Sequence, residues 1–109
     1  MTDTQAALAG EAYISLETFK RSGDGIKTPI WFAQQGDDFV FMTDGRSWKC
    51  KRVARNPECR FAACGVAGGV KGEWFGGQCF KLDDAAEVAA AEAVLAKKYG
   101  LQWKLGSAM

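Results

Sequence analysis

The sequence predicts a mainly β protein with flanking helices, in which an antiparallel sheet bends toward a barrel. Two patterns support this prediction. Short segments with alternating or continuous apolar side chains follow one another from residue 13, and clusters of Gly, Asp and Ser separate them. A long helical pattern rich in alanine appears only near the C-terminus. The expected order of elements is β-β-β-α-β-β-α.

The first three strands are expected at residues 13–20, 26–35 and 39–43, joined by Ser-Gly-Asp-Gly and Gly-Asp-Asp turns. Together they predict a three-stranded meander. Large apolar side chains occupy odd and even positions of the second and third strands, so both faces need to be covered. Pro29 has no backbone N–H, which favours an edge position for the second strand.

A short helix is expected next, at residues 48–55, with Ser47 as its N-cap and an Asn-Pro dipeptide at its end. Strands are then expected at residues 58–66 and 73–82, on either side of a glycine-rich loop. Two adjacent glycines inside the later strand predict a bend or a bulge there.

The last element is a helix that begins after Asp83 and Asp84 and ends before Gly100. Acidic residues at its start and lysines at its end match the helix dipole. Its apolar positions share one face, which predicts packing on the sheet. These positions are Val88, Ala91, Leu95 and Tyr99.

Length and composition predict one domain at residues 12–105, preceded by an arm or short helix (1–11) and followed by a tail (106–109). The 109 residues are 48% hydrophobic and 25% charged, as in ordinary globular proteins. Histidine is absent, which excludes Ser-His-Asp hydrolysis, His-ligated zinc and imidazole acid–base catalysis. The net charge of +1 predicts neither nucleic-acid nor membrane binding. Without a signal-peptide or membrane-span pattern, a cytoplasmic location is expected.

The four cysteines, at positions 50, 59, 64 and 79, have no CxxC spacing. No metal site is therefore expected. In a reducing compartment, buried thiols that behave as small hydrophobic groups are the simplest interpretation.

The strongest functional signal is a local excess of positive charge. Residues 46–60 contain six basic side chains and a single acidic one, Glu58. The first turn of the expected helix lies in this segment, so an anion there would meet backbone amides, the Ser47 hydroxyl and the Lys49 ammonium. This combination favours a phosphate group. A solvated helix face and a weak nucleic-acid patch are the alternatives.

A second signal is the density of aromatic residues around this helix in the sequence. Most of them are expected in the core, but an apolar slot on an edge strand near Pro29 would also suit a planar ligand. A phosphate anchor beside such a slot is typical of a flavin-like cofactor. The aromatic residues are Trp31, Phe32, Phe39, Phe41, Trp48, Trp74 and Phe75.

Several short segments, taken in order, resemble one family across nearly the whole chain after residue 10. They are residues 13–19, 28–32, 47–52 and 55–57, then Trp74, Gly77 and residues 82–84 and 98–103. The set resembles the pyridoxamine 5′-phosphate oxidase-like FMN-binding split-barrel superfamily, specifically its short branch of FMN- or F420-dependent oxidoreductases. The resemblance implies a six-stranded antiparallel split β-barrel, a short helix after the third strand and a C-terminal helix. It also implies a homodimer with two cofactor sites between the subunits.

The resemblance further implies which residues bind the cofactor. In the family, the segment that matches Ser47, Lys49, Lys51 and Arg52 holds the phosphate. The segment that matches residues 28–31 lines the ring, and the strand with Trp74 and Gln78 approaches from the partner chain. The implied cofactor-binding residues are Thr28, Pro29, Ile30, Trp31, Thr43, Ser47, Lys49, Lys51, Arg52, Trp74 and Gln78.

The expected function is therefore hydride transfer between FMN, or the deazaflavin F420, and a small organic substrate, with no catalytic side chain required. The chain lacks the C-terminal Arg and His that pyridoxamine 5′-phosphate oxidases use on their substrate, so that activity is not assigned. Two alternatives remain open. One is a non-catalytic protein of the same fold that binds flavin, heme or another planar ligand. The other is a cofactor-free dimer in which Trp48 fills the pocket.

Overall fold

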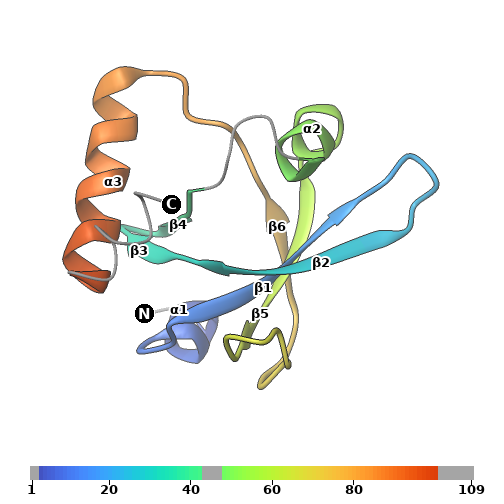
Figure 1. Ribbon diagram of the computed structural model, residues 1–109, viewed down its shortest axis with the longest axis horizontal. Helices are drawn as coiled ribbons and strands as arrows, with labels where there is room; N and C mark the ends of the chain where they lie inside the picture. Colours follow the sequence, from blue (N-terminus) through green and yellow to red (C-terminus); the bar gives the residue numbers. More distant parts are fainter. Residues whose placement is uncertain (1–2, 43–47, 101–109) are drawn as a thin grey trace. The chain divides into compact units, whose positions relative to one another are not determined.

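A computed structural model describes residues 3–42 and 48–100 of the chain. The chain divides into two compact units, one of residues 1–31 and 43–81 and the other of residues 32–42 and 82–109. The described residues form six strands and three helices (Figure 1). The strands lie in two antiparallel sheets, which confirms the mainly β class with flanking helices. They form two separate sheets and no closed barrel.

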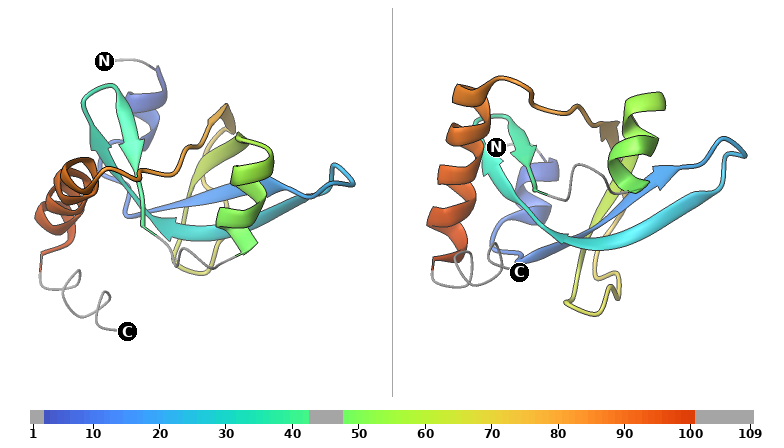
Figure 2. Two further views of the ribbon diagram at one scale, coloured as in Figure 1. Left: turned by 90° about the horizontal axis from the view of Figure 1, so that it is seen from above. Right: turned by 45° about the horizontal axis from the view of Figure 1, so that its top comes forward.

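The first unit is built on a four-stranded antiparallel sheet, visible in Figures 1 and 2. Its strand order is β2 (Gly25–Trp31), β1 (Tyr13–Phe19), β5 (Glu58–Cys64) and β6 (Phe75–Gln78). The central strand β1 lies between β2 and β5 and is buried along its middle five residues, so both of its faces are covered. Helix α1 (Asp3–Leu8) packs against β5 and buries Leu8.

The strand register assigns each side chain to one of two faces, since directly opposed residues share a face. Face A carries Leu16 of β1 together with its partners Thr28 and Phe61, and every second residue from these. Face B carries the residues between them, such as Glu17 with its partners Lys27 and Arg60. Helix α2 (Trp48–Arg55) lies on face A, where it contacts β1.

The β1–β2 hairpin and α2 form where the sequence predicts them. The Lys20 backbone N–H donates to the Asp24 carbonyl at 2.9 Å, which closes the predicted turn. Pro29 lies on an edge strand, as its missing N–H requires. Helix α2 spans residues 48–55, as expected, and ends before Pro57.

The prediction of one strand at residues 26–35 is wrong. The segment breaks at Phe32 into β2 and a second strand, β3 (Ala33–Gln35). The Tyr99 hydroxyl lies 2.9 Å from the Phe32 amide nitrogen and 2.8 Å from its carbonyl oxygen, so the side chain takes the backbone groups that a continuing strand would use. The Lys98 ammonium also donates to this carbonyl, at 2.8 Å.

The predicted meander is also wrong, because β3 pairs only with β4 (Asp38–Val40) in a sheet of its own. Strand β4 begins one residue earlier and ends sooner than the expected strand at residues 39–43, whose last residue, Thr43, lies outside the described residues. Because the strand expected at residues 26–35 forms two strands, α2 follows the fourth strand and not the third.

Helix α3 (Ala85–Tyr99) packs on β3 in the second unit, as predicted from its apolar stripe. The Asp84 carboxylate accepts a hydrogen bond from the Glu87 N–H at 3.0 Å and caps the helix start. Ala91, Leu95 and Tyr99 are buried, whereas the fourth predicted position, Val88, is half-buried.

Strand β6 is shorter than expected, and the predicted bulge at Gly76 and Gly77 is absent from it. Both glycines pair in regular register with β5. A Cβ atom at Gly77 would lie 3.3 Å from the Phe61 ring, so the missing side chain makes room for this ring. None of the described helices combines the length and apolar character needed to cross a bilayer.

Candidate functional site

Helix α2 presents an indole and a lysine together at its start. The Trp48 side chain is 70% exposed. The Lys51 ammonium lies 4.4 Å from the centroid of the Trp48 ring, at cation–π distance. Trp48 therefore fills no pocket within the described part of its own chain. Two predicted cofactor-binding residues, Thr43 and Ser47, lie outside the described residues.

The two arginines of α2 attach the helix to β1. The Arg52 Nε donates to the Thr18 hydroxyl at 2.7 Å, and Thr18 is fully buried. The Arg55 Nη2 donates to the Phe19 carbonyl, also at 2.7 Å. Arg52 thus has a structural contact that the sequence did not indicate, although its guanidinium keeps further N–H donors.

The two lysines of α2 are arranged differently. Lys51 is exposed and Lys49 is half-buried, and no carboxylate in the described part of the chain forms an ion pair with either. Positive charge without an acidic partner, on a helix that also carries arginines, is the electrostatic feature that an anionic group would recognise.

The four predicted ring-lining residues of β2 divide between the two faces of the sheet. Thr28 and Ile30 lie on face A, together with α2. Pro29 and Trp31 lie on face B, where Trp31 is 6.5 Å from the Tyr13 ring between centroids. Ile30 is buried, whereas Thr28 is half-buried and accessible at the edge strand.

The two predicted residues near β6 are on face B. The Trp74 ring lies 5.2 Å from the Lys27 ammonium and 5.0 Å from the Arg60 guanidinium carbon, both measured to the ring centroid. Gln78 is exposed opposite Glu58. The structure thus brings α2, Thr28 and Ile30 to one face and Pro29, Trp31, Trp74 and Gln78 to the other. The predicted residues do not form one pocket within a single chain.

Face B also carries a charged row that the sequence analysis missed. Lys27, Glu17 and Arg60 are direct neighbours across three strands. The Arg60 Nη1 lies 3.3 Å from the Glu17 Oε1, and Glu17 is only 7% exposed. The only signal in the sequence is an acidic residue inside an apolar strand, which does not reveal its partners on other strands.

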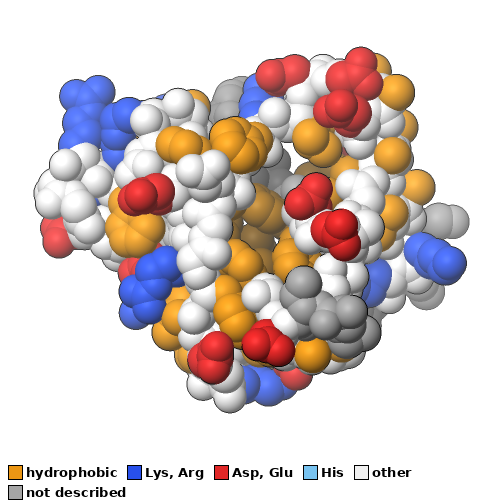
Figure 3. Space-filling view, turned by 180° about the vertical axis from the view of Figure 1, so that it is seen from behind, with side chains coloured by type: hydrophobic (Ala, Val, Ile, Leu, Met, Phe, Trp, Pro, Cys, Tyr) orange, Lys and Arg blue, Asp and Glu red, His pale blue; other side chains and the backbone are white. Residues whose placement is uncertain are grey.

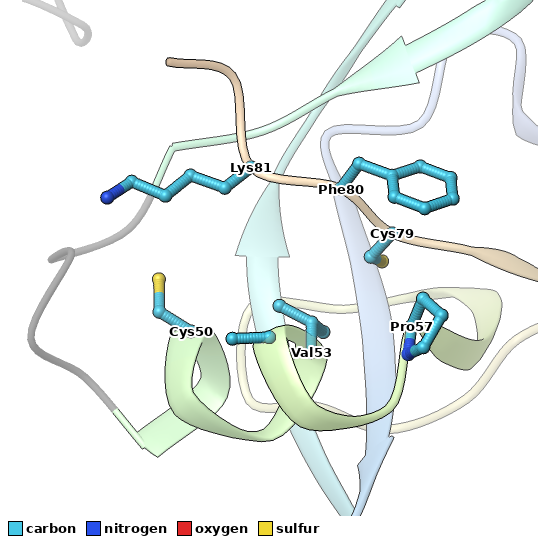
Figure 4. A pocket seen from close by; sticks show the side chains of 7 residues that line it. Cys50, Val53, Pro57, Cys79, Phe80 and Lys81 are labelled. Carbon is cyan, nitrogen blue, oxygen red and sulfur yellow. The ribbon is translucent and has the colours of Figure 1, made fainter.

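A hollow of about 220 Å³ opens beside α2 on face A (Figure 4). An apolar stripe of the helix forms one wall, and the segment that follows β6 forms the other. Phe80 in this second wall is 72% exposed. The lining residues are Cys50, Val53, Ala54, Pro57, Cys79, Phe80 and Lys81.

Two of the cysteines form a thiol pair at this hollow. A hydrogen bond from the Cys59 thiol lowers the pKa of Cys79, although burial of Cys79 opposes this effect. The same hydrogen bond, together with burial, raises the pKa of Cys59. Sequence spacing did not reveal this pair, because the register between two strands decides whether their residues share a face. Among the described residues, no group of three or more possible ligands is placed to hold a metal ion.

Comparison with protein-family models and with curated proteins finds no match to this chain. A search of solved structures finds the crystal structure of a conserved hypothetical protein from Mycobacterium tuberculosis, with a TM-score of 0.74 and 17% sequence identity. The similarity covers 92% of this chain and 65% of that protein, so this chain spans just under two thirds of its length. At this level of identity the similarity shows a shared fold alone.

Proposed function

We propose that the protein is a flavin-type oxidoreductase of the pyridoxamine 5′-phosphate oxidase-like superfamily. It binds FMN, or the deazaflavin F420, and transfers hydride to or from a small organic substrate. The observation that carries the proposal is the pair Lys49 and Lys51 on α2, for which no described carboxylate supplies a partner.

The donor set of α2 fits a cofactor phosphate. Lys49 and Lys51 supply ammonium groups, and the Arg52 guanidinium has N–H donors beyond the one that bonds Thr18. The positive end of the eight-residue helix adds to the attraction. These groups bind and orient an anion, but they supply no acid or base for catalysis. When bound, the flavin or deazaflavin ring supplies the hydride chemistry.

We assign the cofactor ring to the edge strand β2, which shares face A with α2. Thr28 and Ile30 lie on the same face as the helix, and β2 has no neighbouring strand on its outer side among the described residues. Thr28 is accessible and offers a hydroxyl to a planar group, whereas the buried Ile30 offers it only the small apolar surface that remains exposed. Both residues would orient the ring and exclude water from one of its sides.

The division of predicted residues between two faces favours a site made by two chains. In the proposed split-barrel homodimer, one copy contributes α2 and face A to a site, and the other copy contributes face B. Pro29, Trp31, Trp74 and Gln78 then belong to the site that contains the second copy's helix. This arrangement uses every predicted residue in the described ranges, which a single chain does not.

A non-catalytic ligand-binding protein of the same fold is the second candidate. The observation in its favour is Trp48, whose indole stands 70% exposed at the start of α2. An indole in this place would cover a bound planar ligand and keep a substrate away from it. The cofactor-free alternative is less well supported, because Trp48 does not fill a pocket within the described chain.

The phosphate role is tested with the double variant Lys49→Ala/Lys51→Ala. After reconstitution with FMN or F420 and gel filtration, we expect cofactor affinity to fall roughly tenfold or more, because two charge-assisted contacts are lost. Arg52 is left intact, since its removal would also loosen α2. The variant Lys20→Ala/Lys97→Ala removes the same charge from two other exposed lysines and should retain the cofactor. Equal retention in both variants would refute the phosphate role.

Turnover separates the enzyme from the binding protein. Bound cofactor should be reduced by an added hydride donor and then reoxidised by an organic acceptor, as followed by its absorbance. A cofactor that stays bound but cycles no faster than free cofactor would favour the non-catalytic alternative.

A further inference from the structure

The register of β5 and β6 places two cysteines on the same face of adjacent strands. Cys59 of β5 is directly opposite Gly77, and Cys79 follows Gly77 by two positions. The ladder continues to this point, because the Cys79 N–H donates to the Pro57 carbonyl at 2.8 Å. Alternation along the strand therefore puts Cys79 on face A, diagonally opposite Cys59.

The two thiols differ in their access to solvent molecules. Cys79 lines the hollow, which is open to solvent beside the exposed Phe80 ring (Figure 4). Both residues are buried, Cys79 at 9% and Cys59 at 5% exposure, but Cys59 does not line the hollow. Of these two thiols, only Cys79 is therefore within reach of a molecule in the hollow, and Cys59 is the second thiol.

We propose that Cys79 is a thiol–disulfide exchange site, which takes a low-molecular-weight disulfide such as oxidised glutathione from the hollow and forms an internal disulfide with Cys59. The proposal is independent of the proposed oxidoreductase function, since it involves neither the α2 lysines nor a cofactor.

The exchange has two steps. The Cys79 thiolate attacks one sulfur of the small disulfide, which breaks its S–S bond, releases one small thiolate and leaves a mixed disulfide on Cys79. Cys59 then loses its proton and attacks the Cys79 sulfur, which breaks the mixed disulfide and releases the second small thiolate. Two protein thiols are oxidised to one disulfide, and one small disulfide is reduced to two thiols that take up the two protons.

The protonation preferences of the pair match these roles. The thiolate is the attacking species, and the hydrogen bond from Cys59 favours a thiolate at Cys79 by lowering its pKa. The raised pKa of Cys59 keeps this residue protonated as the donor until Cys79 is modified. Once the mixed disulfide forms, Cys79 no longer carries the negative charge that held this proton.

Cys79 is also placed where the backbone can adjust to a disulfide. It lies one residue beyond β6, which is the edge strand of the sheet. The Cα atoms of diagonally opposite residues must move closer together before a disulfide can join them. This movement is possible here, because a segment at the end of an edge strand is hydrogen-bonded to a neighbouring strand on one side only. The new bond would then fix the wall of the hollow that contains Phe80.

The experiment treats the full-length protein with oxidised glutathione, blocks the remaining thiols by alkylation and maps the cysteines by mass spectrometry. The wild-type protein should form a Cys59–Cys79 disulfide, preceded by a glutathione adduct on Cys79. In Cys59→Ala, this adduct should persist and no internal disulfide should form. In Cys79→Ala, neither an internal disulfide nor a glutathione adduct on Cys59 should form.

The matched control is Cys50→Ser, which changes the other cysteine of the hollow. Figure 4 shows the side chain of Val53 between Cys50 and Cys79, so this variant should behave like the wild type. A disulfide between Cys50 and Cys79, a first adduct on Cys59, or no internal disulfide in the wild type would each overturn the proposal. Circular dichroism checks each variant for folding, and the order of products in the wild type decides the question if a variant unfolds.

Discussion

Glu17 is a buried carboxylate in the middle of the first unit's sheet, with a cation on each neighbouring strand. The Arg60 Nη1 is 3.3 Å from its Oε1, yet no donor in the described chain reaches this oxygen with hydrogen-bond geometry. Charge attraction alone therefore compensates this atom for its loss of water. Removal of one partner would leave a buried charge uncompensated, which costs more than removal of the pair.

Gly25 provides the space for this carboxylate. A Cβ atom at position 25 would overlap the end of the Glu17 side chain. We predict that Gly25→Ala lowers the free energy of unfolding by about 1–3 kcal/mol, because the carboxylate must leave its place between Lys27 and Arg60. Urea unfolding measures the change.

Gly76→Ala is the matched control in the same sheet, because a Cβ there meets no atom within 4 Å. It should change the unfolding free energy by less than about 1 kcal/mol. The double variant Gly25→Ala/Glu17→Ala should show a coupling energy, since the second change removes the group that the new methyl displaces. Simple additivity of the two changes would contradict this account of Gly25.

At the scale of elements, α2 is attached to the sheet through Arg52. Its Nε donates to the Thr18 hydroxyl, which has no exposed surface. We predict that Arg52→Ala lowers the unfolding free energy by about 1–3 kcal/mol, because it leaves a buried hydroxyl without its partner. Arg55 bonds an exposed carbonyl, so Arg55→Ala should cost less than about 1 kcal/mol. Urea unfolding of both variants compares the two contacts.

The contact between helix and strand is isolated by the double variant Arg52→Ala/Thr18→Val. Loss of both polar partners should cost less than Arg52→Ala alone, since no buried group is then left unpaired. If Arg52→Ala and Arg55→Ala lower the free energy of unfolding equally, the buried contact with Thr18 is no more stabilising than the exposed one. The Arg52 guanidinium could then bind a cofactor phosphate without loss of a stabilising contact to β1.

Local sequence patterns predicted the elements that local interactions determine. Helix α2 ends where Asn-Pro stops it, the β1–β2 turn follows its Gly and Asp residues, and α3 begins at its Asp84 cap. The break at Phe32 was not predictable in this way. It depends on the Tyr99 hydroxyl, 67 residues away in the sequence, which takes the backbone groups of Phe32.

In the candidate site, too, contacts between residues far apart in the sequence could not be predicted. The sequence identified the cations of α2, but it did not indicate that Arg52 faces β1 while Lys51 lies against Trp48. That difference depends on which side of the helix meets the sheet. The Cys59–Cys79 pair depends on the register of β5 and β6, which is set by pairing between strands and not by cysteine spacing.

At the scale of the whole molecule, each unit exposes apolar side chains that a single chain leaves uncovered. In the first unit, Trp48, Val66 and Phe80 are at least 70% exposed. In the second unit, most alanines of α3 are exposed, so the helix is apolar on more sides than the one that packs on β3. Figure 3 shows hydrophobic side chains at the surface between charged ones. Such surface is typical of a protein that associates with another copy.

We therefore predict that the protein is a homodimer in solution, with a mass by light scattering of twice the chain's 11.8 kDa. The mass should stay the same in Lys49→Ala/Lys51→Ala, because the proposed phosphate contacts bind the cofactor and do not join the chains. A monomeric mass at the concentrations where cofactor binds would contradict the two-chain site. Pro29, Trp31 and Trp74 would then lie on the wrong face to reach a cofactor held by α2, and the proposed site would reduce to the residues of face A.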